Sequence, residues 1–200
     1  MAASSSIFDT VGSASTLIGV VVGAAVATAG SFAASWYERR LFRREREMDG
    51  ALVFAEILRS MSLEIAVVRA AHARGDPFGP ITIRMCRAVR REIDIYDRNR
   101  ERLFVVRDPH LRRQSATLIG RLTFAVDRVL DNTDALASRP DETERAELVA
   151  GREQAFAFMV ACSEELPALS DSFATLANTR LPDYDLESIG FGRPPGAQQG

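Results

Sequence analysis

The sequence lacks lysine altogether, and all 25 of its basic residues are arginine. This excludes a phosphate-binding P-loop with its lysine, a Schiff-base enzyme and a lysine general base. Cysteine is also scarce, because Cys86 and Cys162 are the only two, and they lie far apart in helix-like patterns. We expect both to be reduced and to pack as small, buried apolar side chains rather than to form a disulfide.

Histidine occurs only at His72 and His110, and neither has further metal ligands at a recognisable spacing. The chain contains no G-x-S-x-G, no H-E-x-x-H, no glycine-rich dinucleotide turn and no Glu-x-x-His repeat. Glu164 and Glu165 are adjacent carboxylates, but neighbouring side chains on a helix point apart, which disfavours a shared acid–base site. We therefore predict no catalytic residue, no cofactor and no metal, and we do not expect an enzyme.

Charge is absent from one long stretch, between Asp9 and Glu38. About 20 apolar residues cross the hydrocarbon core of a bilayer, so this stretch is long enough to do so. Three interpretations fit: a cleaved export signal, a buried core helix or a membrane anchor. A signal would begin with positive charge, which "MAASSSIFD" lacks, although "AVATAG" offers a small-residue cleavage site. A core helix in a domain of this size rarely needs so long a run without charge.

The far end of the stretch favours the anchor. Aromatic residues stand where a membrane interface would place them, and the arginine-rich segment "ERRLFRRERE" follows at once. Arginine marks the cytoplasmic side, so we expect the N-terminus outside and the C-terminal part in the cytoplasm, at a bacterial inner membrane. The predicted interface residues are Trp36, Tyr37, Arg39, Arg40, Arg43 and Arg44.

We expect five segments along the chain. They are a short external N-terminus (1–10), a transmembrane helix (11–37), an arginine-rich collar (38–49), a cytoplasmic helical bundle (50–180) and a flexible tail (181–200). Arginine outnumbers acids in the first part of the sequence, and acids outnumber arginine after residue 126. This asymmetry is typical of a membrane-proximal and a membrane-distal portion.

Small residues recur at every fourth position of the predicted span. In a bilayer, small residues at this spacing let two helices approach closely, as in the G-x-x-x-G motif. We therefore predict a homo-oligomer whose helices touch along this face, although the same residues could reflect composition alone. The predicted contact residues are Ser15, Gly19, Gly23, Ala27 and Ser31.

Apolar residues at helical spacing continue after the collar and predict an all-α bundle of antiparallel helices. Asp49 and Gly50 either break the first helix or lie within it. The loop "RGDPFGP" ends it, and the next helix contains "IDIY", which also alternates like a strand. The apolar stripes of these two helices are Phe54, Leu58, Met61, Ile65, Val68 and His72, then Ile81, Met85, Val89, Ile93 and Tyr96.

Two further helices follow. Asp108 and Pro109 predict an N-cap and a first helical proline, and that helix should run to about Ala137. The last helix should begin near Asp141 and be kinked at Pro167, because an interior proline costs about 3 kcal/mol. The apolar positions expected to be buried are Leu111, Leu118, Leu122, Ala125, Val129, Leu136, Leu148, Met159, Leu166, Phe173 and Leu176.

The order of span, collar, "LVFAEIL" helix, "YDRNRERL" and "DPHL" resembles uncharacterised bacterial single-span inner-membrane proteins with a cytoplasmic helical domain. The resemblance covers roughly residues 11–130 and implies no activity or functional residue. The residues that carry it are Glu56, Ile57, Tyr96, Asn99, Leu103, Asp108, Pro109 and Leu111.

The segment from Arg84 to Arg113 is rich in arginine, with ten arginines and five acids. Arginine with interleaved aromatic residues can bind nucleic acid. However, Arg90, Asp94 and Arg98 are spaced four apart, as on the salt-bridged, solvated face of a helix. We favour the solvated face over contact with anionic lipid or an acidic partner, and we expect nucleic acid least of all.

Taken together, these patterns predict a non-enzymatic, membrane-anchored helical module that self-associates and positions an unknown protein partner. The alternative is a membrane-perturbing effector of phage or defence type, in which the small-residue helix assembles into a pore.

Overall fold

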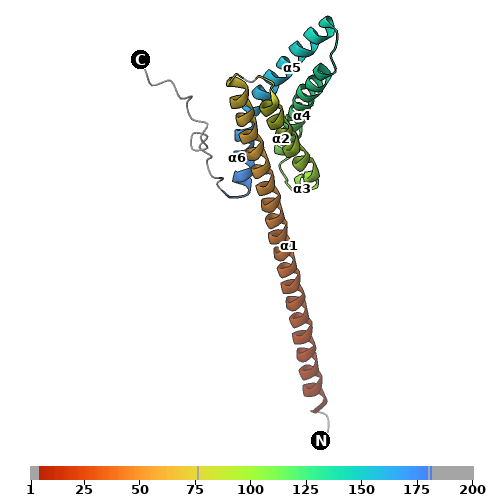
Figure 1. The fold of residues 1–200 in the computed structure, drawn as a ribbon. Coiled ribbons are helices and arrows are strands. Elements are labelled where there is room, and N and C mark those ends of the chain that lie inside the picture. The colour runs from red at the N-terminus through yellow and green to blue at the C-terminus, as the bar shows by residue number, and fades with distance from the viewer. Residues whose placement is uncertain (1–4, 76, 180, 182–200) are drawn as a thin grey trace, which may run out of the picture. The chain divides into compact units, whose positions relative to one another are not determined.

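The computed structural model describes residues 5–75, 77–179 and 181, with their side chains described from residue 27 onward. Every regular element among these residues is an α-helix (Figure 1), which confirms the all-α fold class. Leu181 is the only described residue of the predicted tail. The helices are α1 (Ser5–Ala73), α2 (Pro80–Arg98), α3 (Arg100–Leu103), α4 (Pro109–Ala137), α5 (Glu142–Ser163) and α6 (Leu166–Leu176).

The chain divides into two compact units, residues 1–46 and 47–200. In the first unit, every side chain from residue 27 to residue 46 is exposed. No helix in the fully described part of the chain is long and apolar enough to cross a membrane. Most of the uncharged run precedes residue 27, outside that part, so a transmembrane helix over 11–37 stays a prediction.

Asp49 and Gly50 lie inside α1, so the first helix continues through them and does not break there. A glycine in a helix costs about 1 kcal/mol relative to alanine, because the unfolded glycine has more conformational freedom to lose. A Cβ atom at Gly50 would lie 3.2 Å from the carbonyl oxygen of Arg102. The missing side chain therefore lets the backbone that follows α2 approach α1 closely.

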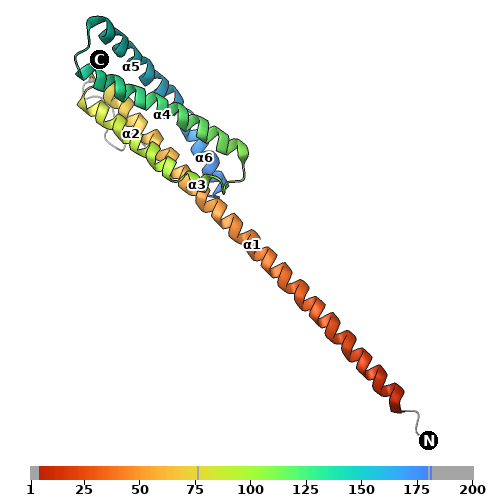
Figure 2. The same cartoon turned by 90° about the vertical axis from the view of Figure 1, so that its right-hand side faces the viewer.

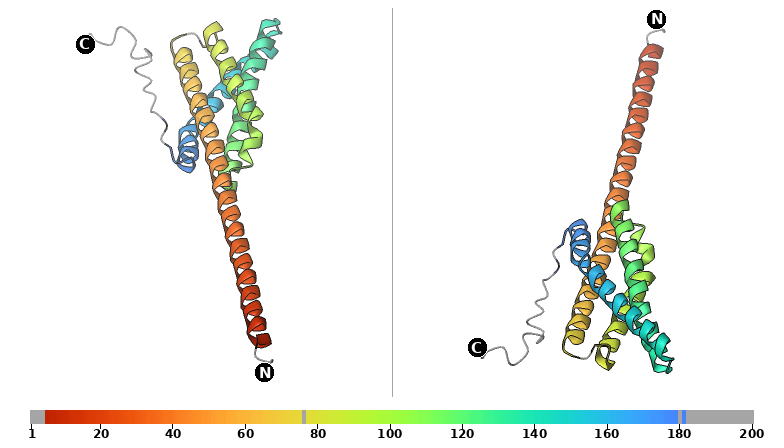
Figure 3. Two further views of the ribbon diagram at one scale, coloured as in Figure 1. Left: turned by 90° about the horizontal axis from the view of Figure 1, so that it is seen from below. Right: turned by 90° about the horizontal axis from the view of Figure 1, so that it is seen from above.

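The second unit is a helical bundle, as predicted, built around α1 from residue 47 onward. α2 and α6 lie beside this part of α1, α4 lies beside α2, and α5 runs back along α4 (Figures 2 and 3). The stripe of α1 from Phe54 to Val68 is buried, whereas His72 is half-buried. The ring centroid of Phe54 lies 5.3 Å from that of Tyr96 in α2 and 5.7 Å from that of Phe173 in α6.

Two buried hydroxyl groups connect the helices through hydrogen bonds. The Ser170 hydroxyl of α6 donates to the carbonyl oxygen of Ala55 in α1 at 2.8 Å. The Tyr96 hydroxyl of α2 donates to Ser115 Oγ of α4 at 3.2 Å. Because a buried hydroxyl without a partner is costly, these two bonds help to fix the register of neighbouring helices.

Both predicted N-caps are present. The Asp108 carboxylate accepts hydrogen bonds from the backbone N–H groups of His110 and Leu111, and Pro109 occupies the first turn of α4. The Asp141 carboxylate accepts from the backbone N–H of Glu144 at the start of α5. Each cap satisfies donors that no helical carbonyl can reach.

The prediction of one kinked final helix is wrong, because the chain forms two helices there. α5 ends at Ser163, and α6 begins at Leu166, with Pro167 in its first turn. A proline in the first turn loses no helical hydrogen bond, whereas an interior proline would. Starting a new helix therefore accommodates Pro167 at lower cost than a kink.

Ile81 is also misplaced by the sequence pattern, because its side chain is 62% exposed. A four-residue spacing drifts by about 40° per step around a helix, so Ile81 lies about 120° from Ile93, which is fully buried. Besides His72, the half-buried side chains among those expected in the core are Met85, Leu136, Leu148 and Leu176.

Candidate functional site

The residues predicted for helix–helix contact belong to the first unit. Ser15, Gly19 and Gly23 lie in α1, but their side chains are outside the described part of the chain. Ala27 and Ser31 are exposed, and the Ser31 hydroxyl donates to the carbonyl oxygen of Thr28 at 2.9 Å. The hydroxyl of Ser31 is therefore satisfied within its own helix, and the contact face stays a prediction.

The predicted interface residues form an aromatic and arginine-rich surface on α1. Trp36 is 63% exposed, and the Arg40 guanidinium carbon lies 5.4 Å from the centroid of its ring. Arg46 lies over the ring of Phe42 at 4.4 Å. Such cation–π contacts hold an arginine against an aromatic side chain while its charge stays in a polar layer. The remaining predicted interface residues, Tyr37, Arg39, Arg43 and Arg44, are all exposed.

A cleft of about 640 Å³ opens between α4 and the junction of α5 with α6. Its floor is apolar and includes Leu118 and Leu169, and its rim carries side chains of both charges. The residues that line it are Arg113, Gln114, Thr117, Leu118, Arg121, Glu164, Glu165, Ala168, Leu169 and Ser172.

Arg121 contacts two other side chains beside this cleft. Its Nη1 donates to Glu165 Oε1 at 2.8 Å, and its guanidinium carbon lies 5.4 Å from the ring centroid of Phe158. The hydrogen bond to Glu165 raises the pKa of Arg121 above its ordinary value. The pair joins α4 to the turn between α5 and α6.

The prediction that Glu164 and Glu165 lie within a helix is wrong, whereas the expectation that their side chains point apart stays a prediction. The two residues form the turn between α5 and α6, and both line the cleft. Sequence patterns did not identify Arg113 or Arg121 as cleft residues, because the packing of α4 beside α6 is a tertiary contact. In the sequence, only Pro167 indicated a helix end near Glu164 and Glu165.

A second cluster joins the loop after α1 to α5. The His72 ring stacks on Phe156 with centroids 4.1 Å apart, and Phe78 meets both rings edge-on. The Arg152 guanidinium carbon lies 4.0 Å from the Phe78 ring centroid, and burial lowers the pKa of Arg152. Phe78 has φ +62°, a conformation that costs about 1–3 kcal/mol, so this packing holds a strained loop in place.

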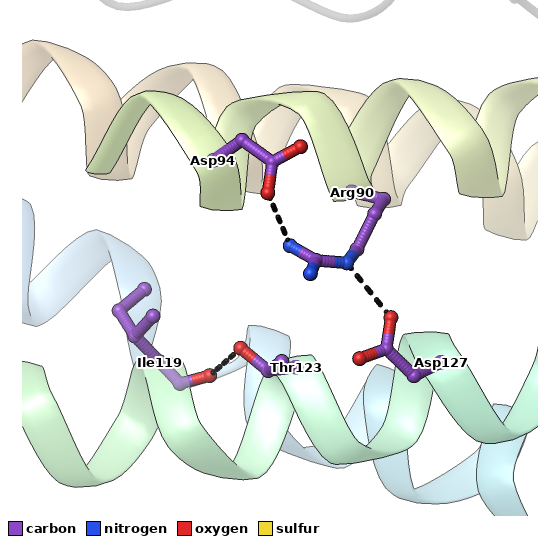
Figure 4. A network of polar contacts seen from close by, with 5 residues as sticks. All are labelled: Arg90, Asp94, Ile119, Thr123 and Asp127. Carbon is purple, nitrogen blue, oxygen red and sulfur yellow. Dashed lines mark hydrogen bonds and ion pairs between the residues drawn. The ribbon is translucent and has the colours of Figure 1, made fainter. Parts of the chain in front are cut away.

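The arginine-rich segment carries the predicted salt bridge on α2. Arg90 Nη1 lies 2.6 Å from Asp94 Oδ1, and Arg90 Nε lies 2.8 Å from Asp127 of α4 (Figure 4). The sequence pattern missed Asp127 because it belongs to another helix. Arg87 also reaches α4, 3.6 Å from Asp134. Two arginines of this face are therefore salt-bridged, and the predicted absence of nucleic-acid binding stays a prediction.

His110 is exposed in the first turn of α4, and both cysteines are free and buried, as expected. Within the described ranges, no three His, Cys, Asp or Glu side chains gather closely enough to hold a metal ion. Comparison of the chain with known protein families, curated proteins and solved structures gave no match.

Proposed function

We propose that the protein is a non-enzymatic helical interaction module, anchored in a bacterial inner membrane by α1 residues 11–37 with its N-terminus outside. The observation that carries the proposal is the exposed apolar surface at the end of this segment. Phe32 is 73% exposed, Trp36 63% and Tyr37 59%. Exposed apolar side chains of this size usually contact a partner or a membrane. The uncharged sequence before them is long enough to cross a bilayer, which favours lipid.

The arginines that follow support a membrane boundary just after Tyr37. Interfacial aromatic residues next to arginines are typical of the cytoplasmic end of a span. Arg40 lies against Trp36, and Arg46 lies against Phe42. These contacts would let the rings face the acyl chains while the guanidinium groups remain among the headgroups.

The bundle supports a role in binding rather than catalysis. Its cleft presents Arg113 and Glu164 at the surface, above an apolar floor. Such a mixture of charges on a concave surface fits a protein partner with charges of both signs. The anchor would then hold that partner at the membrane.

The first test concerns membrane integration. After expression in bacteria, the full chain should remain in the membrane pellet through carbonate and high-salt washes and dissolve only in detergent. Val22→Arg should impair insertion, because an arginine at the centre of a span costs about 2.5–3.5 kcal/mol. Arg43→Gln should leave the protein in the membrane, because one collar charge contributes only about 1 kcal/mol. Release of the unaltered chain by carbonate alone would refute the anchor.

The second test concerns self-association. Gly19→Ile and Gly23→Ile should each insert normally but assemble into smaller species in native detergent gels, because a bulky side chain holds two helix backbones apart. Val21→Ile, which lies on another side of the helix, is the matched control and should assemble as the unaltered chain does. The substitutions are made first in the isolated span and then in the whole chain.

Unchanged assembly in both glycine variants of the isolated span would show that the small residues reflect composition only. The pore-forming alternative is separated by expressing residues 1–48 alone. This fragment should be harmless if the span is only an anchor, whereas a pore would depolarise the cells.

A further inference from the structure

Residues 99–107, which we call the tip, connect α2 to α4 and include α3. Phe104 is 73% exposed and Val105 39% exposed, although both are large apolar residues. Their neighbours Leu103 and Val106 are only 6% and 0% exposed, so both belong to the core. The two exposed side chains are therefore held outward between two buried residues and do not belong to a loose loop.

The tip is attached to the first residues of the bundle. The Arg107 backbone N–H donates to Glu47 Oε1 at 2.8 Å, and Arg107 Nε lies 3.7 Å from Glu47 Oε2. The Arg102 carbonyl oxygen lies against Gly50. The tip thus lies at the end of the bundle that holds residues 47–50 (Figure 2).

Positive charge predominates around Phe104. Residues 97–113 contain six arginines and three acids. One of the acids, Asp108, is engaged as the N-cap of α4. The exposed arginines close to Phe104 in the sequence are Arg98, Arg100, Arg102 and Arg107, the last of which is paired with Glu47.

We propose that the tip docks on the anionic lipid surface, with Phe104 among the headgroups and the neighbouring arginines on lipid phosphates. The inference rests on the proposed anchor. Tyr37 and Glu47 are ten positions apart, about 15 Å along a helix, so an anchor at Tyr37 keeps the tip, which is attached to Glu47, within reach of the bilayer. An exposed aromatic ring surrounded by arginines is the composition of segments that bind anionic membrane surfaces.

A lipid surface suits the tip better than a protein partner or a second copy of the chain. The apolar side chains that it exposes are two neighbours, which is a small area for a stable protein interface. A membrane already brought close by the anchor needs only a small additional attraction, because docking is then an intramolecular step. Docking would hold the bundle against the bilayer and so determine which of its surfaces face the cytoplasm.

The test uses the full chain in lipid nanodiscs, either neutral or containing anionic phosphatidylglycerol. A polarity-sensitive fluorophore is attached at Phe104→Cys, and at Phe124→Cys and Ile81→Cys as controls. The two control residues are 66% and 62% exposed and lie on α4 and at the far end of α2. Labelling is selective, because both native cysteines are buried and burial raises the pKa of Cys86 to about 12.

We expect the probe at position 104, and neither control probe, to shift its emission to the blue in anionic nanodiscs and to be quenched by spin-labelled lipid. The shift should be lost in neutral lipid and at about 1 M salt, where the Debye length falls to about 3 Å. In the Phe104→Cys background, Arg100→Gln should lower the ratio of docked to undocked tip about fivefold, the effect of one arginine near an anionic surface. Arg84→Gln, near the other end of α2, should not change that ratio.

Trp36 is the only tryptophan in the chain and reports on the anchor independently. Quenching of Trp36 by brominated lipid, with no blue shift of the probe at position 104, would overturn the docking proposal and leave the anchor standing. Absence of Trp36 quenching would overturn the anchor, and the docking with it. A blue shift of the probe at position 104 in detergent without lipid, increasing with protein concentration, would assign the tip to contact with a second copy. It would also overturn the proposal.

Discussion

Phe54→Ala should lower the free energy of unfolding of the bundle by about 3–5 kcal/mol, as expected for truncating a fully buried phenylalanine. Phe54 is 0% exposed, and its ring contacts Tyr96 from one helix and Phe173 from another. The substitution would therefore leave a cavity where α1, α2 and α6 meet. Typical domains are stable by about 5–15 kcal/mol, so this loss is a large part of the total. Urea unfolding of the full chain in detergent, followed by circular dichroism, measures the loss.

Phe124→Ala is the matched control for this experiment. Phe124 is 66% exposed on α4, so its truncation removes little packing and should change the stability by no more than about 0.5 kcal/mol. Equal losses in the two variants would show that Phe54 does not occupy the centre of the core.

Raising the pH from 8 to 10 should destabilise the bundle through Cys86 by about 1.4 kcal/mol. Burial raises the pKa of this thiol from 9.0 to about 12. The unfolded chain therefore loses the thiol proton above pH 9, whereas the folded chain keeps it. The stabilising contribution is fully present below pH 9 and is lost as the pH rises towards 12. Burial also raises the pKa of Tyr96 and of Cys162, so these two groups likewise make the bundle less stable as the pH rises.

Cys86→Ala isolates the contribution of this one thiol. At pH 8 the variant will be less stable than the unaltered chain because it loses buried volume. Its stability should fall less between pH 8 and pH 10 than that of the unaltered chain, by about 1.4 kcal/mol. Urea unfolding at the two pH values measures both slopes. Equal slopes would mean that Cys86 ionises in the folded bundle as readily as in the unfolded chain.

The helices could be predicted largely because their signals are local. The stripe from Phe54 to Val68 repeats at helical spacing, and Asp108 and Asp141 are N-cap residues next to helix-forming sequence. The prediction of one final helix was wrong because the local sequence there is compatible with two structures. A proline such as Pro167 is compatible with a kink or with a new helix, and only the packing of α6 on α1 and α4 selects the second.

The candidate cleft could not be predicted from the sequence pattern. Arg121 and Glu165 are far apart in the chain, and nothing in either neighbourhood indicates the other. The same holds for Asp127, which completes the Arg90 salt bridges from a different helix. Such contacts depend on which helices become neighbours, and helical periodicity carries no information on that choice.

The sequence by itself determined the helical class, the positions of both caps and the buried state of the cysteines, because periodicity, side-chain hydrogen bonding and hydrophobicity act over a few residues. Only the tertiary structure decided that α1 continues through Gly50, that Glu164 and Glu165 share a cleft, and that Phe104 is held outward at the tip. Each of these depends on a contact between segments that are distant in the chain. The folded bundle brings such segments together to bury its apolar surface.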